Sequence, residues 1–159
     1  MIDIDLAVTS DRWSALGDAE ALVRRAVEAV LSVASTGDDE DLELSLLLAD
    51  DAALRELNLA WRGQDKATNV LSFPAPPQPE APGPRPLGDI ALAFETLARE
   101  AETQGKALAD HAAHLIVHGV LHLLGYGHDD EAEAEAMEAL EVRALARLGI
   151  ADPYREMAA

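Results

Sequence analysis

The chain has 159 residues, of which 49% are hydrophobic and 26% are charged, so its length and composition match one globular domain and exclude a disordered chain. The absence of cysteine excludes a disulfide scaffold, a thiolate metal site and a cysteine nucleophile. The formal net charge of -18 is the reverse of what a free-standing nucleic-acid binder carries. Apolar stretches are shorter than a membrane-spanning helix requires, and the N-terminus carries acids where a signal peptide carries bases, so we expect a cytoplasmic protein.

The spacing of apolar residues predicts strands and helices in alternation. From Ile2 to Leu6 apolar and acidic residues alternate, which is typical of a strand with one solvated face. Further strands are expected at 42–48, 69–73 and 88–94, and helices at 18–34, 50–62, 95–104, 108–124 and 129–148. This order predicts an α+β or mixed α/β fold: a single domain over residues 1–159, with one four-stranded sheet packed against helices.

A proline-rich segment separates the third expected strand from the fourth. Seven of the eight prolines lie between Pro74 and Pro86, and their lack of backbone N–H groups predicts an extended surface loop over 74–87. Asp89 follows this loop. Its carboxylate can orient a ligand or cap a turn, and the sequence favours the turn.

Histidines are concentrated in one region, because all five lie between His111 and His128. His118 and His122 are four residues apart on the predicted helix 108–124, so their side chains stand on one face and can share a metal ion. A single helical histidine is usually a core or surface residue, but several imidazoles on an apolar helix need partners, which a divalent cation supplies.

A third ligand requires a reversal of the chain, because a residue six positions along a straight helix lies about 9 Å further up its axis. Gly125 and Gly127 permit that reversal and bring His128 back toward the pair. Three nitrogen ligands leave one coordination position open, which is typical of a catalytic zinc site.

The remaining histidines are expected to have other roles. His114 lies four residues before His118 and forms a rival pair, but the glycine turn favours the later pair. We therefore predict that His114 is a second-layer or core residue beside the ligands. His111, near the start of the helix, is expected to be solvated.

The spacing of His118, His122 and His128, with a glycine three residues after the second histidine, is similar to that of the zinc helix of metzincin proteases. Those proteases use a glutamate after the first histidine as the general base. Gly119 stands at that position here and cannot take a proton. Peptide hydrolysis by that mechanism is therefore not expected.

A longer resemblance extends over the chain from about residue 42 onward. The segment from His118 to His128, His-Gly-Val-Leu-His-Leu-Leu-Gly-Tyr-Gly-His, resembles the signature H-G-x-L-H-L-x-G-Y-D-H of the YbeY family of bacterial metal-dependent endoribonucleases. Gly127 replaces the aspartate of that signature. Further matching segments lie at Leu57-Asn58 through Arg62, Thr68 to Pro74, Leu87 to Ile90, Met137 to Glu141 and Asp152 to Tyr154.

The resemblance implies a zinc-binding α/β fold in which His118, His122 and His128 hold one Zn²⁺. It also implies cleavage of single-stranded RNA, 3′-end maturation of small-subunit ribosomal RNA, and a part in ribosome quality control. Arg62 matches a family arginine associated with activity. Its guanidinium can hold the scissile phosphate or stabilise the added negative charge.

The expected reaction is metal-assisted phosphodiester hydrolysis, with the phosphate held by Arg62. The sequence indicates no carboxylate as general base, and either water or the RNA 2′-hydroxyl can attack. The acidic chain is expected to bind free RNA weakly and to rely on the ribosomal small subunit or an assembly protein for delivery. The alternatives are a peptidase-like zinc hydrolase and a non-catalytic ribosome-assembly factor with a structural metal.

Overall fold

The structure is a computed structural model that describes residues 2–34, 40–76, 82–127 and 129–154. At its centre lies one four-stranded sheet with the order β1-β2-β4-β3. Its strands are β1 (Ile2–Val8), β2 (Leu42–Ala49), β3 (Val70–Pro74) and β4 (Arg85–Ala93). Strands β1, β2 and β4 are parallel, whereas β3 pairs antiparallel with β4 and forms an edge. The predicted α+β fold with one four-stranded sheet is confirmed.

All five expected helices are present: α1 (Ala19–Val33), α2 (Asp51–Arg62), α3 (Phe94–Gln104), α4 (Leu108–Leu123) and α5 (Glu131–Arg147). Aspartate side chains at Asp18, Asp50 and Asp130 cap α1, α2 and α5, each accepting a hydrogen bond from a backbone N–H of the first turn. A short 3-10 helix, η1 (Asp11–Leu16), was not expected from the sequence. It buries the indole of Trp13.

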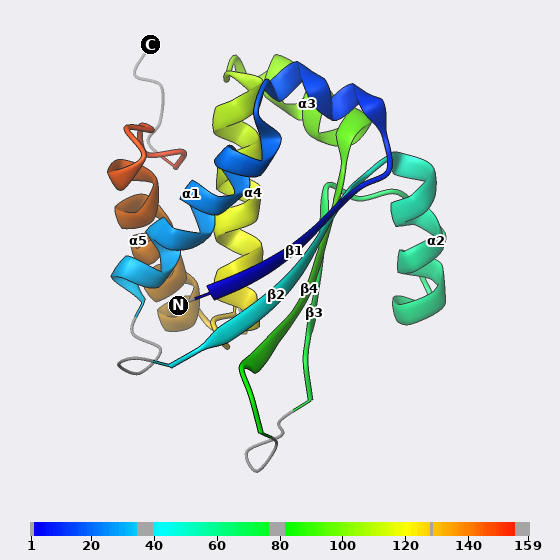
Figure 1. Cartoon of the computed structure of the whole chain (residues 1–159). Helices are drawn as coiled ribbons and strands as arrows, with labels where there is room; N and C mark the ends of the chain where they lie inside the picture. Colours follow the sequence, from blue (N-terminus) through cyan, green and yellow to red (C-terminus); the bar gives the residue numbers. More distant parts are fainter. Residues whose placement is uncertain (1, 35–39, 77–81, 128, 155–159) are drawn as a thin grey trace.

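Helices cover the sheet unequally. Helices α1, α4 and α5 lie on one face, and α2 lies against the other (Figure 1). The apolar side of β1 and β2 joins the main core with α1, α4 and α5, while a smaller apolar cluster under α2 includes Leu54 and Leu71. None of the helices in the described ranges combines the length and hydropathy needed to cross a membrane.

Helix α4 lies close against β3 and β4. A Cβ atom added at Gly119 would lie 3.1 Å from Cδ1 of Ile90 and 3.1 Å from Oγ of Ser72. The missing side chain therefore permits the approach of helix to sheet. Because most of α4 is buried, only a narrow stripe of the helix remains for chemistry.

The proline-rich segment is shorter than predicted at both ends. Pro74 belongs to β3 and pairs with Gly88, and Pro86 belongs to β4, which begins at Arg85. Prolines are tolerated at edge strands and at strand starts, where a backbone donor is not required. Asp89 consequently lies inside β4, opposite Ser45 and Phe73, so the expectation that it caps a turn is wrong. Residues 77–81 of the predicted loop lie outside the described residues.

Candidate metal centre

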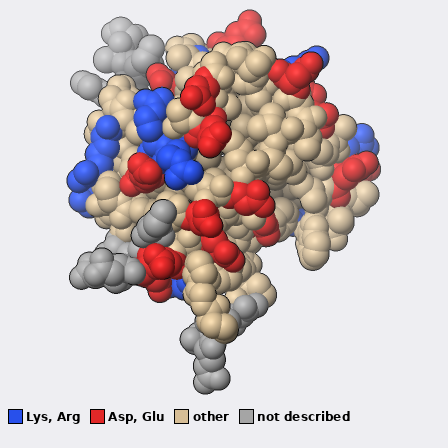
Figure 2. All heavy atoms as spheres, viewed as in Figure 1, with Lys and Arg blue, Asp and Glu red and all other residues tan. Residues whose placement is uncertain are grey.

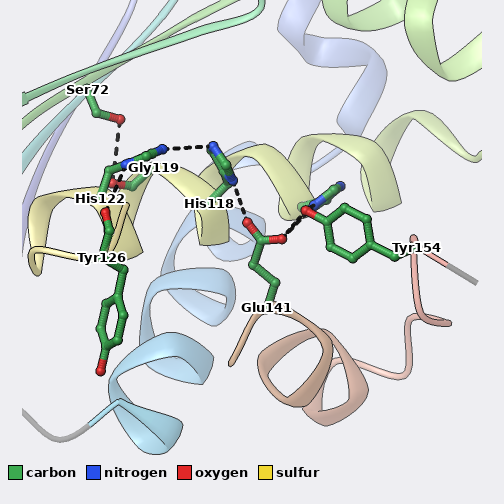
Figure 3. A network of polar contacts seen from close by, with 8 residues as sticks. Ser72, His118, Gly119, His122, Tyr126, Glu141 and Tyr154 are labelled. Atoms are coloured by element: carbon green, nitrogen blue, oxygen red, sulfur yellow. Dashed lines mark hydrogen bonds and ion pairs between the residues drawn. The ribbon is translucent and has the colours of Figure 1, made fainter. Parts of the chain in front are cut away.

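Two of the predicted ligands meet on α4. The Nε2 atoms of His118 and His122 are 3.0 Å apart, as Figure 3 shows. Nε2 of His114 instead contacts Glu141 on α5 and Tyr154 in the C-terminal segment. The structure thus brings together the later of the two rival pairs.

The other ring nitrogens of this pair are both held by acceptors. Nδ1 of His118 donates to the Glu141 carboxylate, and Nδ1 of His122 donates to the carbonyl oxygen of Tyr126 at 3.1 Å. Because a carbonyl and an ionised carboxylate only accept, each neutral imidazole carries its proton on Nδ1 and a lone pair on Nε2. A metal ion binds an imidazole through such a lone pair, and the two Nε2 atoms face each other on one side of α4. This donor set fits a zinc ion.

Glu141 contributes a buried negative charge to the centre. Its carboxyl group lies on α5 with no exposed surface. Burial favours the neutral acid, but hydrogen bonds from His114, His118 and Tyr154 outweigh it and hold the pKa of Glu141 at about 2. An ionised carboxylate behind a histidine ligand raises the basicity of that ligand and fixes its ring.

His114 and Tyr154 surround the same carboxylate. The Tyr154 hydroxyl donates to Oε2 of Glu141, and Nε2 of His114 lies 3.5 Å from that oxygen and 3.3 Å from the tyrosine oxygen. Burial and the contact with Glu141 raise the pKa of Tyr154, so its phenol stays protonated as a donor. His114 therefore contacts the residue that orients His118.

His128, the third predicted ligand, lies outside the described residues. In the part of the chain that the structure describes, no three His, Cys, Asp or Glu side chains are grouped to hold a metal ion. Gly125, just after the end of α4, has the positive φ of 103° that a chain reversal requires. The ligand role of His128, and with it the metzincin-like geometry, stays a prediction.

His111 is buried, so the expectation of a solvated residue is wrong. Only 4% of the residue is exposed, and its Nε2–H donates to Glu100 on α3 at 3.0 Å. Asn69 donates to the same carboxylate. The start of α4 packs against α3, which covers the imidazole. Burial lowers the pKa of His111, although the carboxylate of Glu100 opposes this shift.

A cleft of about 450 Å³ opens beside the histidines. Its walls come from α3, α4, the start of β3 and the C-terminal segment, and they include Asn69, Lys106, His111, His114, His118 and Tyr154. The cleft is large enough for part of an extended polymer. His118 lies on its wall, so a molecule in the cleft lies next to the candidate metal centre.

Arg62 lies at the end of α2 on the other side of the edge strand. One guanidinium nitrogen donates to the Ser72 carbonyl at 3.3 Å, and the Ser72 hydroxyl donates to the Gly119 carbonyl at 3.5 Å. The guanidinium carbon also lies 5.9 Å from the centre of the Phe73 ring. Strand β3 thus links Arg62 to the turn of α4 between the two histidines.

Neither position 119 nor Asp89 can supply a general base beside His118 and His122. A side chain at Gly119 would point at Ile90 and Ser72, against the sheet. The carboxylate of Asp89 lines a hollow with Asp3 and Asp5, on the sheet face opposite α4.

Sequence reasoning assigned no role to Glu141 or Tyr154. Glu141 is four residues after Met137 and four before Leu145, both of which are buried. An acid at this position on the apolar face of a helix is a signal that could have identified it. Tyr154 offers no such signal, because its contact with Glu141 depends on how the C-terminal segment folds back.

Known proteins resemble this chain over nearly its whole length. The family described as Endoribonuclease YbeY matches residues 8–149. A protein of that description from Rhodopseudomonas palustris is 52% identical over 156 residues, covering 96% of this chain and 90% of the relative. Another, from Azorhizobium caulinodans, is 52% identical over 155 residues, covering 96% of each chain.

The fold also has a solved counterpart. The solution structure of TM1509 from Thermotoga maritima matches with a TM-score of 0.57 and 21% identity, covering 97% of this chain and all of that one. This structural match, at 21% identity, shows that the fold is shared. The sequence matches show the family. The resemblance inferred from the histidine signature is confirmed, and the chain belongs to the YbeY endoribonuclease family.

Proposed function

We propose that this chain is a zinc-dependent endoribonuclease that cleaves single-stranded RNA and matures the 3′ end of small-subunit ribosomal RNA, with a part in ribosome quality control. The metal is one Zn²⁺ held by His118, His122 and His128. The observation that carries the proposal is the pair of converging Nε2 atoms, 3.0 Å apart, whose Nδ1 atoms are both engaged elsewhere. Membership of the endoribonuclease family supports RNA as the substrate.

Each residue of the site has a distinct task in this proposal. A bound zinc ion supplies Lewis acidity at a phosphoryl oxygen. Glu141 and the Tyr126 carbonyl keep the two imidazoles in the tautomer that presents Nε2. Arg62 swings from the Ser72 carbonyl to a phosphate oxygen, where its planar fork of donors stabilises added negative charge. The nucleophile in this proposal is water or the RNA 2′-hydroxyl. No carboxylate is assigned as the general base that would activate it.

The charge of the chain limits how RNA reaches the site. In the view of Figure 2, acidic side chains are spread over the surface, and basic ones gather mainly at the left, over α1 and α5. A net charge of -18 repels a polyphosphate beyond the immediate surroundings of Arg62 and the metal. We infer that the protein acts in the cytoplasm on RNA presented by the ribosomal small subunit or an assembly protein.

Two other functions receive less support. A peptidase-like hydrolase needs a base beside the first histidine, and Gly119 faces the sheet instead. A non-catalytic assembly factor with a structural metal would use the same histidines but would not need Arg62 or the adjoining cleft. The two possibilities differ from the proposal in what they predict for RNA cleavage.

A cleavage assay on a small-subunit rRNA 3′ precursor tests the proposal. Wild-type protein is compared with His122→Ala and Arg62→Ala, and Arg55→Ala serves as a matched control because Arg55 is an exposed α2 arginine paired with Asp65. We expect cleavage to be lost in the first two variants and kept in the control, with similar thermal melting for Arg62→Ala and wild type.

Other outcomes decide between the functions. Cleavage that survives the loss of His122 would eliminate metal catalysis. A protein that never cuts RNA, and whose histidine variant unfolds, would support the structural-metal function. Cleavage of a peptide by the wild type, without any cleavage of RNA, would support the hydrolase of another class.

A further inference from the structure

An exposed tryptophan and a partly buried phenylalanine lie beside Arg62. Trp61 is 73% exposed, the highest value among the large hydrophobic residues that the structure describes as exposed. Its indole lies next to the Phe73 ring, with centroids 6.3 Å apart and planes tilted by 54°. The Arg62 guanidinium lies over the same phenylalanine. We call Trp61, Phe73 and Arg62 the aromatic platform.

The aromatic platform and the histidine pair lie on opposite sides of one strand. Successive residues of β3 point to opposite faces, so the hydroxyl of Ser72 contacts Gly119 of α4, while Phe73 contacts Trp61 of α2. Since β3 is the edge of the sheet, only this strand separates the two groups. A polymer that crosses the edge of β3 can contact both.

The backbone that carries the platform is fixed before any ligand arrives. Gly63 ends α2 in the left-handed conformation and donates to the Leu59 carbonyl at 3.1 Å. The side chain of Asn58, which is buried, donates to the Lys66 carbonyl at 3.0 Å and holds the loop that leads to β3. A ligand that binds the platform therefore meets a preorganised backbone, which lowers the entropy cost of binding.

Stacking suits this chain better than charge as a source of affinity for RNA. Binding through phosphates needs many cations, and the chain has only 12 Lys and Arg residues against 30 Asp and Glu. An exposed indole instead binds the face of an unpaired base, which is available in single-stranded RNA whatever its sequence. Arg62 beside the indole can contact the adjoining phosphate.

We propose that the aromatic platform binds an unpaired nucleobase of the RNA strand, which stacks on the exposed face of Trp61. This inference rests on the proposed nuclease function and assigns it a substrate-binding subsite. It accounts for an exposed tryptophan next to an arginine at the edge of the sheet. It also predicts that single strands bind better than duplexes, whose bases are already stacked.

Tryptophan fluorescence tests the proposal directly. The chain has two tryptophans, and Trp13 is buried with 1% exposure, so quenching by an added strand reports on Trp61. The probe is a short single strand of deoxyadenylate, and the matched strand has the same phosphates but abasic sites. We expect the first strand to quench the zinc-loaded wild type and the abasic strand to leave its fluorescence unchanged.

Variants separate stacking from folding. Trp61→Ala is expected to weaken binding of the deoxyadenylate strand about 10-fold, and Trp61→Phe is expected to be intermediate. Leu59→Ala is the matched control, because Leu59 is the other large exposed apolar residue of α2 and should have no effect. In RNA cleavage, Trp61→Ala should raise KM about 10-fold and leave kcat nearly unchanged.

The results also distinguish this proposal from the nuclease proposal. Equal quenching by the abasic strand, or an unchanged KM in Trp61→Ala while cleavage continues, would overturn the platform and leave the nuclease intact. Base-dependent quenching by a protein that never cuts RNA would support the platform and remove the nuclease.

Discussion

The carboxylate of Glu141 accepts a hydrogen bond from Nδ1 of His118, and this contact joins α5 to the histidine helix. Glu141 is buried and ionised, with a pKa of about 2 despite the burial that opposes its charge. The pair fixes the His118 tautomer and places a negative charge behind a nitrogen that faces the candidate metal position. We therefore expect Glu141 to influence both the stability of the fold and the proposed affinity for metal.

Replacing this carboxylate should weaken metal binding more than it harms the fold. Glu141→Gln keeps the shape and one acceptor but removes the charge, so we expect zinc affinity to fall about 10- to 100-fold. Competition with a chromophoric chelator measures the affinity. Glu135→Gln, on an exposed position of the same helix, is the control and should match the wild type. Equal affinity in both variants would show that Glu141 has no influence on the metal.

Restoring a glutamate at the metzincin position should not create a protease. A side chain at Gly119 meets Ile90 and Ser72 at 3.1 Å, so Gly119→Glu forces α4 away from the sheet and buries a charge. We expect a loss of about 3 kcal/mol in the free energy of unfolding, measured with urea, and no peptide cleavage. A stable variant that cleaves peptides would contradict the placement of this face of α4.

The free energy of unfolding should decrease in mildly acidic solution because His111 is buried as a neutral imidazole. Its pKa is lowered in the folded protein by burial, despite the opposing effect of Glu100, so the unfolded chain binds the proton more readily. The contribution of the neutral imidazole is present above the unfolded pKa of about 6.5 and is lost as the pH falls from that value through the lower pKa of the folded protein.

Urea unfolding of metal-free protein at several pH values measures this dependence. His111→Gln keeps a donor for Glu100 but does not titrate, and it should show a smaller decrease in stability between neutral and mildly acidic pH. An identical pH dependence in both proteins would mean that His111 does not contribute to it.

Local patterns predicted the elements of this fold well, because helix and strand periodicity depends on neighbours in sequence. The helices expected at 18–34 and 50–62 are found as α1 and α2, each within one residue of its predicted bounds. The pair His118 and His122 was predictable for the same reason, since residues four apart on a helix share a face.

Long-range contacts were not predictable in this way. The burial of His111 follows from the packing of α3 on α4, and the contact of Tyr154 with Glu141 joins two segments that no periodicity relates. The strand expected at 88–94 begins earlier, at Arg85, and this extension depended on prolines being accepted in the strands on both sides of the loop. Glu141 was within reach of sequence reasoning, because an acid between Met137 and Leu145 on one helix face is unusual.

The central claim is that the converging imidazoles of α4 hold a metal ion that RNA cleavage requires. The most direct measurement is the rate of rRNA precursor cleavage by metal-free protein as zinc is added in substoichiometric steps. We predict no cleavage without metal, and a rate that rises linearly and stops rising at one equivalent of zinc. Full cleavage by protein shown to contain no metal would contradict the claim.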